Sequence, residues 1–337
     1  MPFDPHTSLC LHIGYPKTGT TSLQRNFFER CPEIAYLTRD AGHAAWRLAL
    51  LEARELAFQK GLSEARAGVE QSLERELARG DHEKHIVVHS DESLLSHSMF
   101  FQTRKPPLVY CSDPAVQARK LYSLFATLHP SPKLLVSVRR QDTLLEALYA
   151  QVKRLVFARF PQTKSFSDFV AYALEHPQDF VLDALDFQSV IGHYARLFGS
   201  ENVHVAVFEE LEREPTRYLR KIFRFLGVRD ETSALALAQE RRHNANAEPV
   251  GRRTDTRDLV ELLNQYRLRY LPRVRVNQPW LIPALPWLRK VRVPGRVDAT
   301  IVLDPAKRAL VRELFAPGNR ELSAAYQLDL GRHGYFD

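Results

Sequence analysis

The sequence predicts an α/β protein with three layers, in which helices flank a central, mainly parallel β-sheet. Short apolar runs that are typical of buried strands alternate along the chain with longer segments of helical periodicity. Parallel strands need helical crossovers and are covered on both faces, which makes their sequences almost wholly apolar. The chain has 337 residues, of which 45% are hydrophobic and 26% charged, so it is long enough to bury such a core.

Each predicted strand is a short apolar run followed by turn or helix signals. The first strand, at 9–13, ends at Gly14. The other strands are expected at 86–88, 134–138 and 203–208. The expected helices lie at 21–30, 44–79 (with breaks at Gly61 and Gly68), 116–128, 143–158, 166–174, 187–198 and 215–226. Gly227 follows the last of these, as glycine commonly does after a helix end.

The basic charge is concentrated in one late segment. Residues 251–300 hold ten Arg and one Lys against four acidic residues, which equals the +7 net charge of the whole chain. Such a local excess indicates an anionic ligand, a membrane face or an acidic acceptor. We predict that residues 1–250 form the core, with a helical insertion near 44–79, and that residues 251–337 form a basic, helical extension of the same domain. Five prolines make 271–295 an irregular stretch.

Cysteine and histidine spacing predicts neither disulfides nor a metal site. The three cysteines are widely spaced and are expected to be reduced, and His82 and His85 have no third ligand nearby. No run of 18 apolar residues suggests a transmembrane helix, and residues 1–11 lack the basic start of a secretory signal. We therefore expect a cytoplasmic protein without a bound metal.

The most informative segment is the loop at residues 14–22, with the sequence GYPKTGTTS. It follows a strand and opens a helix, a context in which backbone N–H groups and the positive helix end bind an anion. The glycines have the GxxxxGK[ST] spacing, but Thr20 occupies the position of the usual lysine and Lys17 lies inside the loop. One lysine and several hydroxyls suit an anion with fewer charges than a nucleoside triphosphate, bound without a metal.

Three segments resemble sulfotransferases that use 3′-phosphoadenosine 5′-phosphosulfate (PAPS). The loop is similar to the family's 5′-phosphosulfate loop over YPKTGTTSLQ, residues 15–24. Residues 136–142, VSVRRQD, are similar to the family's 3′-phosphate motif. Residues 208–228 resemble the late strand and the helix that ends in FLGV. The resemblance covers 9–30 and 133–228 in the expected order, and it implies a P-loop-related sulfotransferase fold with PAPS as co-substrate.

The resemblance also implies roles for individual residues. Lys17 would meet the charge that grows on the bridging oxygen as the nucleotide leaves, and Arg139 would pair with the 3′-phosphate. The 5′-phosphate would be held by the backbone and hydroxyl groups of Thr18, Gly19, Thr20, Thr21 and Ser22. Arg242, in a basic stretch after the FLGV helix, would close over the nucleotide. One position departs from the pattern, because Ala147 stands where the family has a serine eight residues after the arginine.

The acceptor hydroxyl needs a general base, which we expect in HSDES, residues 89–93, after the second predicted strand. Bacterial sulfotransferase-like sequences have Ser-Ser-Glu in a similar place, which favours Glu92. His89 has the more suitable unperturbed pKa near neutrality, and Asp91 would serve if it were desolvated. We rank Glu92 first, His89 second and Asp91 third. His12, in contrast, lies within a strand and is expected to be a packed core side chain.

The leading hypothesis is transfer of the sulfuryl group from PAPS to a hydroxyl acceptor, a carbohydrate or a glycolipid. The alternative is a P-loop kinase or nucleotide hydrolase, since VVHSD at 87–91 resembles a weak Walker B strand. A third hypothesis, a non-catalytic binder of nucleic acid or membrane through 251–300, leaves the loop unexplained. Trp280 and Trp287 lie beside a cationic cluster at 289–292, which predicts peripheral contact with an anionic membrane at its inner face. No nucleic-acid partner is expected.

Overall fold

The computed structural model describes residues 7–37, 55–78, 84–96, 113–159, 165–176, 181–240, 256–258, 292–294 and 301–337. The chain forms two compact units. The larger unit comprises Met1–Leu144, Pro177–Asn246 and Leu310–Asp337, and the smaller comprises Leu145–His176 and Ala247–Ala309. The larger unit contains the central sheet and the loop that the sequence analysis singled out.

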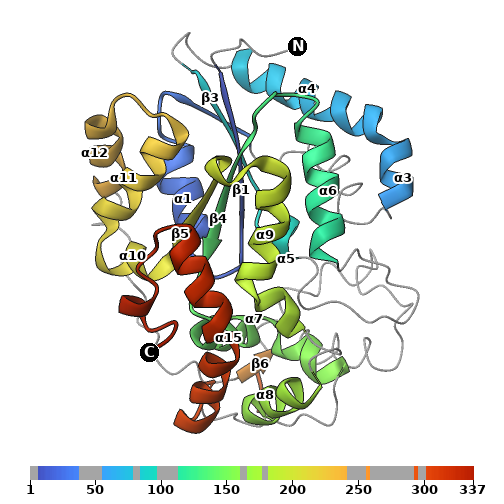
Figure 1. Cartoon of the computed structure of the whole chain (residues 1–337), viewed down its shortest axis with the longest axis vertical. Coiled ribbons are helices and arrows are strands. Elements are labelled where there is room, and N and C mark those ends of the chain that lie inside the picture. The colour runs from blue at the N-terminus through green and yellow to red at the C-terminus, as the bar shows by residue number, and fades with distance from the viewer. Residues whose placement is uncertain are drawn as a thin grey trace. The chain divides into compact units, whose positions relative to one another are not determined.

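The larger unit is built on a five-stranded sheet with the order β2-β3-β1-β4-β5 (Figure 1). Its strands are β1 (Ser8–Gly14), β2 (Ile34–Leu37), β3 (Ile86–Ser90), β4 (Lys133–Val138) and β5 (Val203–Val207). All four neighbouring pairs are parallel, so the strands end at one common edge. The predicted α/β fold is confirmed, while β2 was missed because its apolar run is only four residues long.

Helices cover both faces of this sheet, as Figure 1 shows. One face carries α1 (Thr20–Leu23), its π-helical continuation η1 (Gln24–Phe28), α11 (Pro215–Leu226) and α12 (Glu231–Glu240). The other face carries α6 (Pro114–Phe125) and α9 (Phe187–Phe198), with α3 (Glu55–Lys60) and α4 (Leu62–Ala78) beside α6. The short helical segments of this unit are η2 (Val181–Leu185), η3 (Ser200–Asn202), α5 (Ser93–Ser96), α10 (Phe208–Arg213) and η5 (Gly331–His333).

The predicted helical insertion is helical over its described part. It breaks at Gly61, as expected, but the break expected at Gly68 is wrong because α4 runs through that residue. The Gly68 carbonyl accepts a hydrogen bond from Ser72 Oγ at 2.9 Å. Neighbouring residues of high helix propensity outweigh the cost of one glycine, about 1 kcal/mol.

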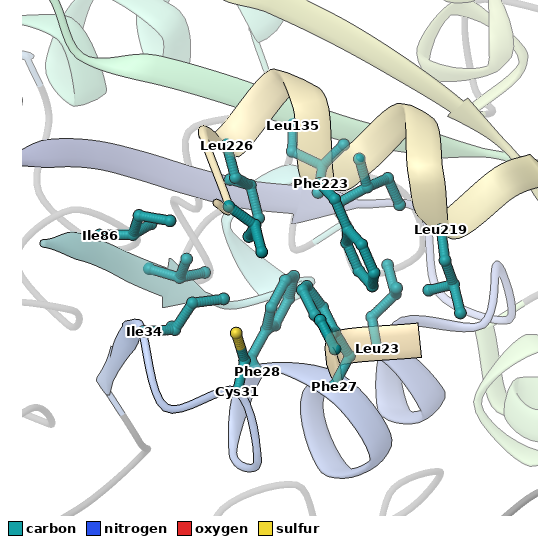
Figure 2. Packing of buried hydrophobic residues seen from close by; sticks show 14 of the residues in the cluster. Leu23, Phe27, Phe28, Cys31, Ile34, Ile86, Leu135, Leu219, Phe223 and Leu226 are labelled. Carbon is teal, nitrogen blue, oxygen red and sulfur yellow. The ribbon is translucent and has the colours of Figure 1, made fainter. Parts of the chain in front are cut away.

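A hydrophobic cluster fixes η1 and α11 against the sheet (Figure 2). The ring of Phe27 stacks on that of Phe223, with centroids 4.3 Å apart. The apolar side of α11 follows helical spacing and consists of Leu219, Ile222, Phe223 and Leu226. Burial of each such side chain contributes about 1.5–3 kcal/mol, so the helix that follows the loop has a firm base.

The smaller unit contains most of α7 (Gln141–Arg159), α8 (Phe166–Glu175) and the start of α15 (Pro305–Ala325). A capping box between Ser165 and Asp168 begins α8. Glu146 accepts hydrogen bonds from Arg308 at 2.5 Å and from the backbone N–H of Leu303 at 2.9 Å. The described part of 251–300 is a ribbon of two antiparallel strands, β6 (Thr256–Asp258) and β7 (Arg292–Pro294).

Several sequence-based predictions fall on residues outside the described ranges. These are Arg242 and its basic neighbours, His82, Cys111, Trp280 and Trp287. Cys10 and Cys31 are described, and both are free and buried.

Candidate active site

The loop that connects β1 to α1 depends on two glycines. A Cβ on Gly14 would lie 3.0 Å from both Ser137 Cβ and Thr20 Cγ2, so a larger residue would displace the loop from the sheet. Gly19 has φ 80° and a Cβ there would lie only 2.7 Å from Leu211. Glycine alone meets both demands at position 19. The result is a close-packed turn at the edge where the parallel strands end, the edge at which such sheets bind ligands.

The loop uses some of its hydroxyls to hold its own shape. Thr18 is fully buried and donates from Oγ1 to the carbonyl oxygen of Tyr15 at 2.5 Å. Thr20 is also buried, whereas Lys17 and Thr21 are exposed and Ser22 is partly exposed. Among the candidate phosphate ligands at residues 17–22, the accessible side chains are therefore those of Lys17, Thr21 and Ser22. Thr18 contributes to the turn itself.

The end of β3 brings a carboxylate to the loop. Thr20 Oγ1 donates a hydrogen bond to Glu92 Oε2 at 2.6 Å. The other two candidate bases, His89 and Asp91, are 0% exposed. The His89 ring stacks on Phe125 of α6, with centroids 6.3 Å apart. Of the three side chains, only that of Glu92 is partly exposed, and it contacts the loop through Thr20.

A buried histidine ties three strand ends together beneath the loop. His12 Nδ1 lies 2.7 Å from Ser90 Oγ, and its Nε2 lies 2.9 Å from Ser137 Oγ. Burial lowers the pKa of His12 to about 3, so the ring is neutral near neutral pH. Gln24 Nε2 also donates to Ser90 Oγ, at 2.9 Å. The prediction of a core histidine is confirmed, but the serine partners were missed because they adjoin it only through strand pairing.

Arg139 follows β4 and reaches the same loop. Its Nη1 donates to the carbonyl oxygen of Lys17 at 3.1 Å, and its Nε donates to Thr143 Oγ1 at 3.1 Å. The guanidinium lies 4.7 Å from the ring centroid of Phe208, a cation–π distance. Phe208 was missed as a site residue because it was expected to end the strand at 203–208, whereas β5 ends at Val207 and α10 begins at Phe208. Ala147 lies on α7 and is partly exposed.

The donor set suits a phosphate or sulfate ester. The compact loop carries Lys17 and leads into the first turn of α1, where hydroxyl groups are accessible, and Arg139 lies beside it. In the described ranges no group of three or more His, Cys, Asp or Glu residues could hold a metal ion. Also within these ranges, no helix has the length and apolar character needed to cross a membrane.

Comparison with known proteins decides the family. The sequence profile described as "Sulfotransferase domain" matches residues 10–246, well over half of the chain. The chain belongs to the sulfotransferase domain family. As a member it is an enzyme that uses PAPS as co-substrate, which confirms the predicted enzyme class and co-substrate and disfavours the kinase alternative. The matched region contains most of β1, the loop, Glu92 and Arg139.

One solved sulfotransferase structure shares the fold at low sequence identity, and two others are less similar. A sulfotransferase from Alicyclobacillus acidocaldarius is 16% identical with a TM-score of 0.51, and the match covers 96% of this chain and 98% of that one. Sulfotransferase STF9 from Mycobacterium avium is 11% identical with a TM-score of 0.41, covering 87% and 79%. Mouse sulfotransferase SULT7A1 complexed with PAP is 16% identical with a TM-score of 0.35, covering 71% and 66%. No curated protein matches this sequence.

Proposed function

We propose that this sulfotransferase transfers the sulfuryl group of PAPS to a hydroxyl group of a carbohydrate or glycolipid, with Glu92 as general base. The observation that carries the proposal is the 2.6 Å hydrogen bond from Thr20 to Glu92. It brings a carboxylate to the first turn of α1, beside the loop expected to hold the phosphosulfate. A base must lie within hydrogen-bond reach of the hydroxyl it deprotonates.

The donor half of the site consists of Lys17, Arg139 and the exposed hydroxyls of Thr21 and Ser22. Lys17 stabilises negative charge on the bridging oxygen, and Arg139 pairs with the 3′-phosphate through charge-assisted hydrogen bonds. The 5′-phosphate lies against the loop and the first turn of α1. Because sulfuryl transfer, like phosphoryl transfer, needs mainly positioning and charge stabilisation, these groups account for most of the protein's contribution.

In the transfer step the acceptor oxygen attacks the sulfur atom in line with the leaving group. A bond forms between the acceptor oxygen and sulfur, and the bond from sulfur to the bridging oxygen breaks. The acceptor proton passes to Glu92, and adenosine 3′,5′-bisphosphate leaves with the bridging oxygen. The burial of His89 and Asp91 supports Glu92 over the other two candidates, since neither buried side chain is accessible to an acceptor.

The choice of acceptor rests on the resemblance and on the composition of 251–300. Arginines together with Trp280 and Trp287 suit a sugar or lipid headgroup at an anionic membrane, on the cytoplasmic side. Sedimentation with anionic vesicles at low and high salt tests the membrane contact, and we expect salt to weaken it. Vesicle binding that does not depend on salt, or no binding at low salt, would contradict this part of the proposal.

The experiment for the activity is mass spectrometry of oligosaccharides and glycolipids after incubation with PAPS. We expect a new sulfate ester on a sugar hydroxyl with the native protein and almost none with Glu92→Gln. Glu29→Gln, at an exposed carboxylate at the end of η1, is the matched control and should retain activity. Sulfation of simple phenols or alcohols, with no sugar modified, would overturn the acceptor class. Full activity of Glu92→Gln would overturn the assignment of the base.

A further inference from the structure

The C-terminal segment Leu310–Asp337 lies outside the matched family region, yet its end is deeply buried in the larger unit. Leu330 and Tyr335 are 0% exposed, and His333 is 3% exposed. Residues that merely end a chain are usually poorly ordered and exposed unless contacts hold them. The burial of these residues therefore indicates that specific contacts hold this segment in the larger unit.

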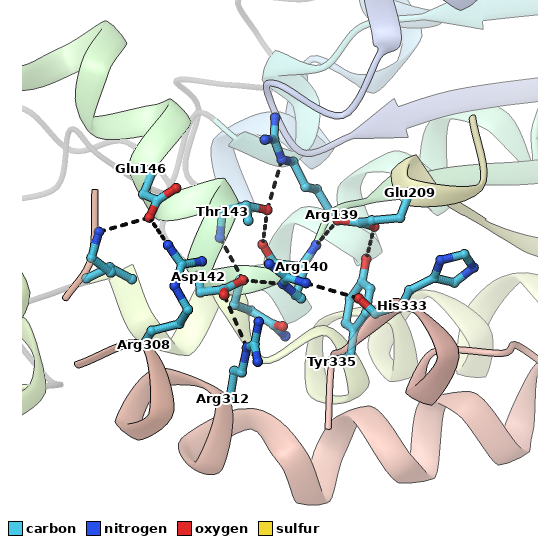
Figure 3. Close-up of polar contacts among 12 residues, drawn as sticks. Arg139, Arg140, Asp142, Thr143, Glu146, Glu209, Arg308, Arg312, His333 and Tyr335 are labelled. Carbon is cyan, nitrogen blue, oxygen red and sulfur yellow. Dashed lines mark hydrogen bonds and ion pairs between the residues drawn. The ribbon is translucent and has the colours of Figure 1, made fainter. Parts of the chain in front are cut away.

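The segment contacts three consecutive residues at the exit of β4, of which Figure 3 labels Arg140 and Asp142. Arg140 donates from Nη1 to the carbonyl oxygen of His333 at 3.2 Å. The side-chain amides of Gln141 and Asn319 bond to each other in both directions, at 2.9 and 3.1 Å. Asp142 is fully buried and accepts from Arg312 at 3.2 Å as well as from Arg140 at 2.6 Å.

A fourth contact passes through Glu209, which follows β5. Tyr335 donates from its hydroxyl to Glu209 Oε2 at 2.9 Å, and the backbone N–H of Arg140 donates to Glu209 Oε1 at 3.0 Å. Glu209 is only 8% exposed, so its carboxylate depends on these donors to offset the loss of water. Glu209 thus couples the tail to the main chain at Arg140.

Arg139 is the residue directly before this restrained turn. The peptide unit that joins Arg139 to Arg140 contains the N–H held by Glu209, so the tail acts within one bond of the Arg139 backbone. The side chain of Arg139 then reaches Lys17 and Thr143. A shift of the turn would move the guanidinium away from the loop, and small displacements of a binding group have large effects.

From these contacts we propose that the C-terminal segment positions Arg139 for the 3′-phosphate of the nucleotide, with Tyr335 as the main positioning residue. This inference rests on the proposed role of Arg139 in nucleotide binding. Tyr335 does not touch the nucleotide; it acts through Glu209 and the Arg140 N–H. Truncation of the tail would therefore reduce affinity for the 3′-phosphate specifically.

The test compares two ligands by calorimetry with the full chain. Adenosine 3′,5′-bisphosphate carries the 3′-phosphate and adenosine 5′-phosphate lacks it, so the ratio of their Kd values measures the contribution of that phosphate. Arg139→Ala should reduce the preference for the bisphosphate about tenfold or more. Tyr335→Phe keeps the ring but removes the donor, and it should reduce the preference about threefold to tenfold, the size of one hydrogen bond. Affinity for the monophosphate should stay within about twofold.

Arg320→Ala is the matched control for loosening the tail. Arg320 lies on α15 and its guanidinium packs 5.3 Å from the ring of Phe336, beside Tyr335, without a contact to Arg140 or Glu209 in the described part of the chain. We expect its ligand preference to equal that of the native protein.

A second pair of variants avoids any loss of folding from Tyr335→Phe. Gly334 and Gly227 both have positive φ, but only at Gly334 would a Cβ meet Arg140, at 3.1 Å from Nη1.

Gly334→Ala should therefore lower the bisphosphate preference, while Gly227→Ala carries similar backbone strain and should leave it unchanged. The double variant of Arg139→Ala with Tyr335→Phe should prefer the bisphosphate no less than Arg139→Ala alone does.

If Arg139→Ala lowers the preference but the Tyr335 and Gly334 variants do not, the tail has no positioning role and the proposed function stands. If the Tyr335 and Gly334 variants weaken the binding of both ligands equally, the tail has a purely structural role. An unchanged preference in Arg139→Ala would refute the role of Arg139 and the inference together.

Discussion

The guanidinium of Arg139 donates a hydrogen bond to the carbonyl oxygen of Lys17 at 3.1 Å. Lys17 has φ 66°, a left-handed conformation that is uncommon for a residue with a side chain. The two cations expected to bind opposite ends of one nucleotide are thus joined through the backbone of the loop. A change at one of them is expected to affect the other, so their substitutions should not be additive.

Lys17 offers a test that separates stability from catalysis. Lys17→Gly removes the amine and also relieves the strain of the left-handed conformation. The unfolding free energy of the variant should therefore equal that of the native protein or exceed it by up to about 1 kcal/mol. Its kcat should fall about 10²-fold or more, because charge on the bridging oxygen is no longer stabilised. Thermal unfolding and steady-state rates measure the two effects. A stable Lys17→Gly protein with native kcat would contradict the role of the amine.

Glu92 and Thr20 form a pair whose variants should differ in kind. Glu92→Gln keeps an oxygen for Thr20 but cannot accept the acceptor proton, so kcat should fall about 10²-fold with little change in the Kd of adenosine 3′,5′-bisphosphate. Thr20→Val removes the 2.6 Å hydrogen bond and should reduce kcat by a smaller factor, since the carboxylate remains but is less well oriented. Thr20→Ser, which retains the hydroxyl, should restore most of the loss. Equal kcat values in the valine and serine variants would show that the hydrogen bond has no catalytic effect.

Gly19 and Gly227, two of the glycines with positive φ, separate the cost of backbone strain from the cost of steric crowding. Gly227→Ala should cost about 1 kcal/mol of unfolding free energy from backbone strain alone, because no atom lies within 4 Å of the added Cβ. Gly19→Ala should cost more and should also abolish nucleotide binding, because the Cβ would meet Leu211 at 2.7 Å. Adding Leu211→Ala to Gly19→Ala should recover part of the stability. Chemical denaturation measures each cost, and the absence of any recovery would argue against the steric explanation.

Two histidines, the buried His12 and the partly exposed His204, predict how stability depends on pH. Burial lowers the pKa of His12 to about 3 and that of His204 to about 4, from 6.5. The unfolded chain binds these protons at a higher pH than the folded protein, so the stability they contribute is complete above pH 6.5 and falls as the pH drops toward 4 and 3. Each histidine contributes up to about 1.4 kcal/mol per pH unit in that interval. Denaturation from pH 7 to pH 4 measures the slope.

Replacing His204 with phenylalanine should remove the share of that one histidine. His204 is a suitable choice because it stacks on Phe225 and lies on β5, away from the loop that is expected to hold the nucleotide. The slope of unfolding free energy against pH should be smaller in the variant than in the native protein. The difference should be up to about 1.4 kcal/mol per pH unit, which corresponds to one bound proton. An identical slope in the variant would mean that His204 binds its proton over the same pH range in the folded and unfolded states.

The features that the sequence by itself determined are local in the chain. Apolar runs predicted β1, β3, β4 and β5, and their alternation with helices predicted a parallel sheet. The glycine spacing and Lys17 identified an anion-binding loop, since a handful of adjacent residues dictate its backbone. The sequence did not predict the change from α-helix to π-helix at Gln24 or the short strand β2, because tertiary packing rather than propensity forms them.

Only the tertiary structure decided which distant residues meet. Thr20 and Glu92 are 72 positions apart, and Glu209 and Tyr335 are 126 apart. The sequence ranked Glu92 above His89 but left both open after β3. The alternating faces of the strand and its exit turn placed His89 against Phe125 and Glu92 beside Thr20. The strand order brings β3 and β4 to either side of β1, and that order depends on the burial of the whole sheet, which no local pattern contains.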